Sequence, residues 1–219
     1  MRRLFIRVAF FLLGAGIALS SGAQQLDAPD ALIQRLSGEV LAEVRGDREL
    51  QQGNSTRILE LVRQRILPHV DFERMTSLAV GRYWNRASES QQRRLTEEFR
   101  DLLVYVYSGA LSQVEDNKIV VEPMRGNSAD GEVIVRSKVI QPRGREPIEL
   151  DYRLAREDSG WKIFDVSVLG VWLVQSYRGS FSNEIQQSGI DGLIDTLDRK
   201  NERLAKNMAD NSGKGSSGR

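Results

Sequence analysis

The chain has 219 residues and no cysteine, and its 31 lysines and arginines nearly balance its 30 aspartates and glutamates. The missing cysteines exclude disulfides, thiolate metal sites and a cysteine nucleophile. A protein that binds the phosphate backbone of a nucleic acid needs an excess of basic residues, and this chain has nearly equal numbers of basic and acidic residues. We therefore expect no nucleic-acid partner.

Residues 1–23 have the layout of a secretory signal peptide. Three arginines accompany an apolar run at residues 8–19, and the small residues 21–23 follow. The run is shorter than the roughly 20 residues that a membrane-spanning helix needs. We therefore expect cleavage after Ala23 and a mature protein that begins at Gln24. Export without disulfides favours the bacterial periplasm.

Residues 205–219 are small, polar and rich in glycine. A segment with so few apolar residues cannot offset the entropy of ordering, so the composition predicts a disordered tail. The folded domain is then expected to cover residues 24–204.

Apolar residues at helical spacing predict four helices before any strand. Asp71 is expected to cap the third helix, which ends at Gly81. Ser88 and Gln91 have the spacing of a capping box and begin the longest helix. The four helices are predicted at residues 31–44, 55–67, 72–80 and 88–114.

Alternating and apolar runs then predict four strands in an antiparallel meander. Pro123 places the first strand at an edge of the sheet, and a turn at residues 158–160 joins the last two. The strands are predicted at residues 118–125, 132–141, 148–155 and 161–168.

Helical spacing returns after Gly170, breaks at Gly189 and resumes over residues 190–204. Helices, four strands and helices in that order predict an α+β fold with one antiparallel sheet that is covered on one face.

His69 is the only histidine, and Asp71 and Glu73 follow it closely. A His69-dependent hydrolase is one hypothesis, with a carboxylate orienting the imidazole. Helix capping explains the same residues without catalysis, and one histidine without cysteine does not make a metal site. The Arg82-Tyr83-Trp84 segment is either a cation and aromatic cluster for a ligand or an amphipathic loop.

Several segments, in order over about residues 30–200, resemble the MlaC family of periplasmic phospholipid shuttles. The most specific are PHVDFERM with GRYW, the strand GWKIFDV, and GVWLVQSYRGSF from Gly170 to Phe181. Trp172 departs from the family pattern, where a small polar residue is expected, and we expect it to narrow or cap a pocket entrance.

The resemblance implies a nuclear-transport-factor-like sheet with a helical subdomain around an apolar cavity. It implies a phospholipid as cargo, no other cofactor and no catalysis. It also implies two partners, the MCE-domain subunit of an inner-membrane ABC transporter and an outer-membrane lipoprotein–porin complex. The function is then phospholipid carriage between the two membranes to maintain outer-membrane asymmetry. A hopanoid or another lipid is the alternative cargo.

If the apolar side chains enclose a cavity and not a solid core, its wall is expected to combine a helix stripe with one face of the sheet. Val171 and Tyr177 are expected to close it from the following helix. The other predicted wall residues are Leu103, Val106, Tyr107 and Leu111 on the long helix and Val135, Tyr152, Val166 and Val168 on the sheet.

Overall fold

The computed structural model describes residues 28–113, 117–124 and 131–216, so the predicted signal peptide lies outside the described residues. No helix within these ranges has the length and apolar character needed to cross a bilayer. The elements are α1 (Pro29–Gly46), α2 (Arg48–Gln51), α3 (Ser55–Leu61), η1 (Val62–Ile66), η2 (Leu67–His69), α4 (Phe72–Val80), η3 (Gly81–Arg86), α5 (Glu89–Tyr107), η4 (Ser108–Gln113), β1 (Lys118–Val121), β2 (Glu132–Ile140), η6 (Pro142–Gly144), β3 (Ile148–Glu157), β4 (Gly160–Val168), β5 (Val171–Trp172) and α6 (Leu173–Ser216).

The strands form one antiparallel meander in the order β1-β2-β3-β4-β5. The four predicted strands are present, and β1 lies at an edge as Pro123 indicated. The two-residue strand β5 was not predicted. The α+β prediction is therefore confirmed, with a fifth short strand added to the sheet.

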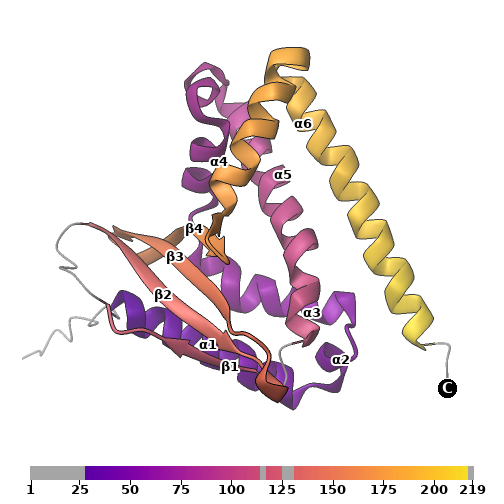
Figure 1. The fold of residues 1–219 in the computed structure, drawn as a ribbon. Coiled ribbons are helices and arrows are strands. Elements are labelled where there is room, and N and C mark those ends of the chain that lie inside the picture. The colour runs from indigo at the N-terminus through magenta and orange to yellow at the C-terminus, as the bar shows by residue number, and fades with distance from the viewer. Residues whose placement is uncertain (1–27, 114–116, 125–130, 217–219) are drawn as a thin grey trace, which may run out of the picture.

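One face of the sheet packs against α1 (Figure 1). Helical spacing puts the apolar residues of α1 on one stripe, which meets the alternate residues of the strands. The buried members of this sheet cluster are Leu32, Ile33, Leu36, Val135, Leu154, Trp161 and Ile163.

Helices α4, α5 and α6 build a second core beside the sheet (Figure 1). Phe99 has no exposed surface there, and its ring meets those of Tyr177 and Phe181 edge to face at centroid distances of 5.0 Å. Gly189, at φ 76° and ψ −178°, divides α6 into two arms, as its position in the sequence predicted. The other buried members of this helical cluster are Met75, Ala79, Val80, Leu95, Leu102, Leu103, Val174, Ile185, Leu193, Ile194 and Leu197.

The predicted caps explain where α4 and α5 begin. Asp71 accepts a 2.9 Å hydrogen bond from the Arg74 backbone N–H, and α4 covers the predicted residues 72–80. The Ser88 hydroxyl and the Gln91 amide form the reciprocal bonds of a capping box at the start of α5. These ends depend on local contacts, which the sequence contains.

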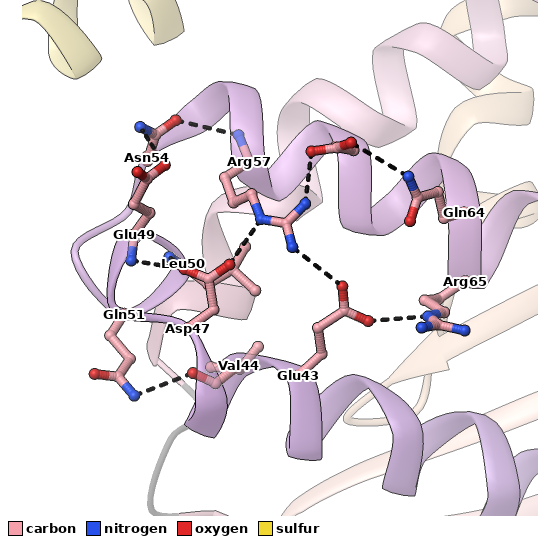
Figure 2. Close-up of polar contacts among 11 residues, drawn as sticks. Glu43, Val44, Asp47, Glu49, Leu50, Gln51, Asn54, Arg57, Gln64 and Arg65 are labelled. Atoms are coloured by element: carbon pink, nitrogen blue, oxygen red, sulfur yellow. Dashed lines mark hydrogen bonds and ion pairs between the residues drawn. The ribbon is translucent and has the colours of Figure 1, made fainter.

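Arg57 holds the corner where α1, α2 and α3 meet (Figure 2). Its Nε is 2.7 Å from Asp47 and its Nη1 is 2.6 Å from Glu60, while Nη2 lies 3.6 Å from Glu43. Glu43 also pairs with Arg65 of the π-helix η1 at 2.9 Å. The Arg57 hydrogen bond lowers the pKa of Asp47 below its usual range.

Helix α6 continues through Ser216, and the predicted disorder of residues 205–219 stays a prediction. The first residues of that segment, Ala-Lys-Asn-Met-Ala, are mostly strong helix formers. The Ser55 hydroxyl donates a 2.9 Å hydrogen bond to the Met208 carbonyl, which joins this arm to α3. The amino-acid composition of this segment gives no indication of the hydrogen bond between Ser55 and Met208.

One parallel bridge connects the N-terminal helices to the sheet. Val70 pairs with Ile163 of β4, and the Asp71 N–H donates a 2.8 Å hydrogen bond to the Ile163 carbonyl. Val70 contacts both the sheet cluster and the helical cluster. The two cores therefore meet at this residue.

Candidate functional site

The predicted sheet residues form a contiguous apolar surface. Val135 is the register partner of Tyr152, which is the partner of Val166, so the three lie in one row across β2, β3 and β4. Val168 follows Val166 by two residues and faces the same side. Burial raises the pKa of the Tyr152 phenol.

The apolar stripe of α5 runs out of the helical cluster before it ends. Leu95, Phe99 and Leu103 are buried along its first part. Val106 and Tyr107 continue the stripe at helical spacing, yet their side chains are 41% and 42% exposed. The structure thus leaves large apolar surface uncovered at the C-terminal end of α5.

Tyr177 links this uncovered end to the helical core. Its ring packs edge to face on Phe99, and its hydroxyl lies near that of Tyr107. Burial is the main cause that raises the pKa of Tyr177 to about 12. Leu103 and Tyr177 thus lie in the same helical cluster, and their role in a lipid-binding wall stays a prediction.

Two predicted wall residues lie elsewhere. Leu111 packs against the cluster of Val40, Val44, Leu50, Ile58 and Leu61 below the Arg57 corner. Val171 belongs to strand β5 and pairs with Val168, and its side chain is 59% exposed. Val171 was therefore wrongly placed on the helix that follows the sheet.

Three surface pockets border other described residues than those of the predicted wall. Pockets of about 360 and 260 Å³ border Glu122 and Pro123 near β1, and one of about 390 Å³ lies beside Trp84 along α5. None of these three pockets is lined by a predicted wall residue.

Asp165 is a buried carboxylate that the sequence analysis missed. Its Oδ1 accepts hydrogen bonds from the backbone N–H groups of Val166 at 2.9 Å and Val174 at 3.1 Å. Its Oδ2 pairs with Arg153 at 3.1 Å, and burial raises its pKa. The sequence gives only a weak indication of this buried carboxylate, namely an aspartate within the apolar strand GWKIFDV.

Trp172 packs against this ion pair. The Arg153 guanidinium lies 4.0 Å from the centroid of its indole ring. Arg153 and Asp165 are register partners, so they face the side of the sheet opposite to Tyr152 and Val166. The expected role of Trp172 at a pocket entrance stays a prediction.

The histidine region is structural. His69 ends the 3₁₀ helix η2, and Asp71 is used as the cap of α4. Within the described ranges, no three histidine, cysteine, aspartate or glutamate side chains gather as a metal site.

Comparison with known proteins agrees with this architecture. The family described as MlaC protein matches residues 34–199. The intermembrane phospholipid transport system binding protein MlaC of Haemophilus influenzae is 24% identical over 192 residues, which cover 87% of this chain and 86% of the relative. The toluene tolerance protein ttg2D of Pseudomonas putida is 25% identical over 210 residues, covering 94% and 95%.

A solved structure gives the same fold. The phospholipid-binding protein of Ralstonia solanacearum, determined in complex with a phospholipid, superposes with a TM-score of 0.76 and 36% identity. The match covers 82% of this chain and 99% of that one. Because the family match spans most of the folded residues and the fold agrees, the chain belongs to the MlaC family.

Proposed function

We propose that this chain carries a phospholipid across the periplasm between the two membranes of its cell. The observation that carries the proposal is the similarity to the Ralstonia protein, which was solved with a phospholipid bound. The MlaC family is a family of carriers and not of enzymes, which removes the reason to assign His69 a catalytic role.

The physics of lipid transfer explains why a carrier is needed. A lipid with about 30 methylenes costs roughly 24 kcal/mol to expose to water, at about 0.8 kcal/mol for each methylene. An apolar site that covers the acyl chains offsets most of that cost. The protein then needs no chemistry of its own.

The uncovered end of the α5 stripe supports the position of the site. Val106 and Tyr107 expose apolar surface next to Tyr177, whereas the rest of the stripe is packed. Large apolar side chains in such a position mark ligand or partner contacts. We propose that acyl chains cover them and extend toward the partly exposed Tyr152, Val166 and Val168, which adjoin the fully buried Val135.

The proposed partners follow from the family. An outer-membrane lipoprotein–porin complex and the MCE-domain subunit of an inner-membrane ABC transporter are the sites where lipid is taken up and delivered. The relative from Haemophilus is named as part of an intermembrane transport system, which supports partners of this kind.

The test introduces a charged side chain at the exposed C-terminal end of the α5 stripe. Val106→Glu leaves the packed core intact, but it places a carboxylate beside the acyl chains, where an unpaired charge is strongly disfavoured. We expect a folded protein with at least about tenfold less bound lipid, measured by native mass spectrometry of the protein purified from periplasm. Lipid extraction with mass analysis identifies the cargo as a phospholipid or a hopanoid.

The matched control is Val120→Glu. Val120 is 51% exposed on the edge strand β1, so the same change in charge and size occurs away from the proposed site. We expect its lipid content to equal that of the unsubstituted protein. Equal lipid content in the Val106 and Val120 variants would contradict the proposed site.

A further inference from the structure

A group of arginines surrounds Tyr83 beyond the end of α4. Arg82 and Arg86 belong to η3 and lie 4.9 and 5.9 Å from the centroid of the Tyr83 ring. Arg82 Nη2 donates a 2.8 Å hydrogen bond to the Tyr83 hydroxyl. This bond and the two nearby positive charges lower the pKa of Tyr83.

Arg178 joins the group from the first arm of α6. A methyl group built on Gly81 would lie 3.2 Å from Arg178 Nη2, so the guanidinium rests against the η3 backbone. Gly81 has a φ of 61°, a conformation that favours glycine and leaves this space open. Ser182, one turn after Arg178, also lies near the Tyr83 hydroxyl.

These arginines have no carboxylate partner within the described parts of the chain. Arg82, Arg86 and Arg178 are all exposed, and no ion pair within 4.0 Å involves them. Other exposed arginines, among them Arg63, Arg143 and Arg203, also lack a carboxylate partner among the described residues, but they lie at separate places. What distinguishes this surface is that two arginines lie over one tyrosine ring and a third rests against the adjoining backbone of Gly81.

We propose that Arg82, Arg86 and Arg178 form a docking surface for an acidic segment of a partner protein, one that presents several carboxylates close together. Guanidinium groups bind carboxylates through paired hydrogen bonds with defined geometry. The Tyr83 ring restrains Arg82 and Arg86 before binding, which lowers the side-chain entropy lost on association.

A protein partner explains the surface better than a lipid bilayer does. Peripheral membrane binding combines basic residues with apolar side chains that enter the interface. The Tyr83 hydroxyl is bonded and its ring lies beneath two guanidinium groups. Among the described residues, the exposed large apolar side chains include none in η3 and only Leu78, 39% exposed, in α4. Charge without an inserting apolar group favours protein carboxylates.

The test measures binding of a fluorescent peptide of eight alternating aspartates and glutamates to the full mature protein at low salt. Arg82, Arg86 and Arg178 are replaced together by glutamine. We expect at least about tenfold weaker binding than in the unsubstituted protein, and a strong decrease of the original affinity as salt rises.

The control replaces three exposed arginines at separate places, Arg63, Arg143 and Arg203, by glutamine. It makes the same change in net charge, and we expect binding within about twofold of the unsubstituted protein. Circular dichroism and bound-lipid content, expected to be unchanged in both triple variants, verify that each variant is folded.

Three results would overturn the proposal. Equal weakening in both triple variants would show an effect of net charge. Cluster-dependent binding to phosphatidylglycerol vesicles without peptide binding would assign the surface to a membrane. Displacement of the peptide by about 1 mM phosphate in a cluster-dependent manner would assign it to a small anion. Each result is independent of whether the protein carries phospholipid.

Discussion

Asp165 and Val174 connect the sheet to the helical core: Oδ1 of the buried Asp165 accepts a 3.1 Å hydrogen bond from the Val174 backbone N–H, in the first turn of α6. The same oxygen accepts from Val166 in β4. A single carboxylate therefore satisfies two backbone donors from different elements. Acids at the start of a helix also interact favourably with its dipole.

Replacing this carboxylate should be costly. Asp165→Ala leaves the Val174 N–H and the Arg153 guanidinium without their acceptor, so we expect the free energy of unfolding in urea to fall by about 2–4 kcal/mol. Asp151→Ala, on the neighbouring strand, is the control and should cost less than about 0.5 kcal/mol. Equal costs would show that Asp165 does not support the junction.

The pH dependence of the free energy of unfolding should report the raised pKa of Asp165. Burial raises its pKa in the folded protein, so the folded state binds this proton more tightly than the unfolded state does. As pH rises from the ordinary aspartate pKa through the raised one, this group makes the folded protein less stable. The difference in unfolding free energy between Asp165→Asn and the unsubstituted protein should therefore shift in favour of the variant over that range. A difference that stays constant with pH would contradict the raised pKa.

Phe99 should be the most sensitive position of the helical cluster. Its ring is fully buried and meets two other rings, so Phe99→Ala should lower the free energy of unfolding by about 3–5 kcal/mol. Chemical denaturation followed by circular dichroism measures the loss. Leu78→Ala removes a partly exposed side chain of α4 and should cost well under half as much; comparable losses would mean that the centre of this core lies elsewhere.

His69→Ala should leave lipid carriage intact. His69 ends a short 3₁₀ helix and the nearby Asp71 is used as a cap, so we expect a stability loss of about 1 kcal/mol and bound lipid within about twofold of the unsubstituted protein. Native mass spectrometry and thermal unfolding supply the two readouts. Complete loss of function in a folded variant would return His69 to the functional site.

Elements defined by neighbouring residues could be predicted closely. Asp71 and Gly81 bound α4 at the predicted residues, and alternation placed the four main strands. The helix predicted at 55–67 instead changes at Val62 into a π-helix and then a 3₁₀ helix. The periodicity of the apolar residues does not distinguish an α-helix from a π-helix, and Pro68 marks only where the α-helix must end.

The candidate site was harder to predict, since periodicity identifies a stripe but not what covers it. Leu103 and Val106 fit the same helical pattern, yet the first is buried by neighbouring helices and the second is uncovered. The contacts of Asp165 likewise depend on how α6 and the neighbouring strand β3 fold back on β4, which an isolated strand pattern does not show.

The bridge between Val70 and Ile163 has a consequence for how the chain folds. It closes a loop of about 90 residues that contains α4, α5 and three strands of the sheet. Closing a flexible loop of that length costs about 4 kcal/mol of chain entropy, whereas the hairpins and helices within it form from nearby residues. The hairpins and helices should therefore form early, and the joining of the two cores at Val70 should come late and limit the folding rate. Until then the chain would expose the apolar faces that the bridge brings together, which makes this step the one most open to aggregation.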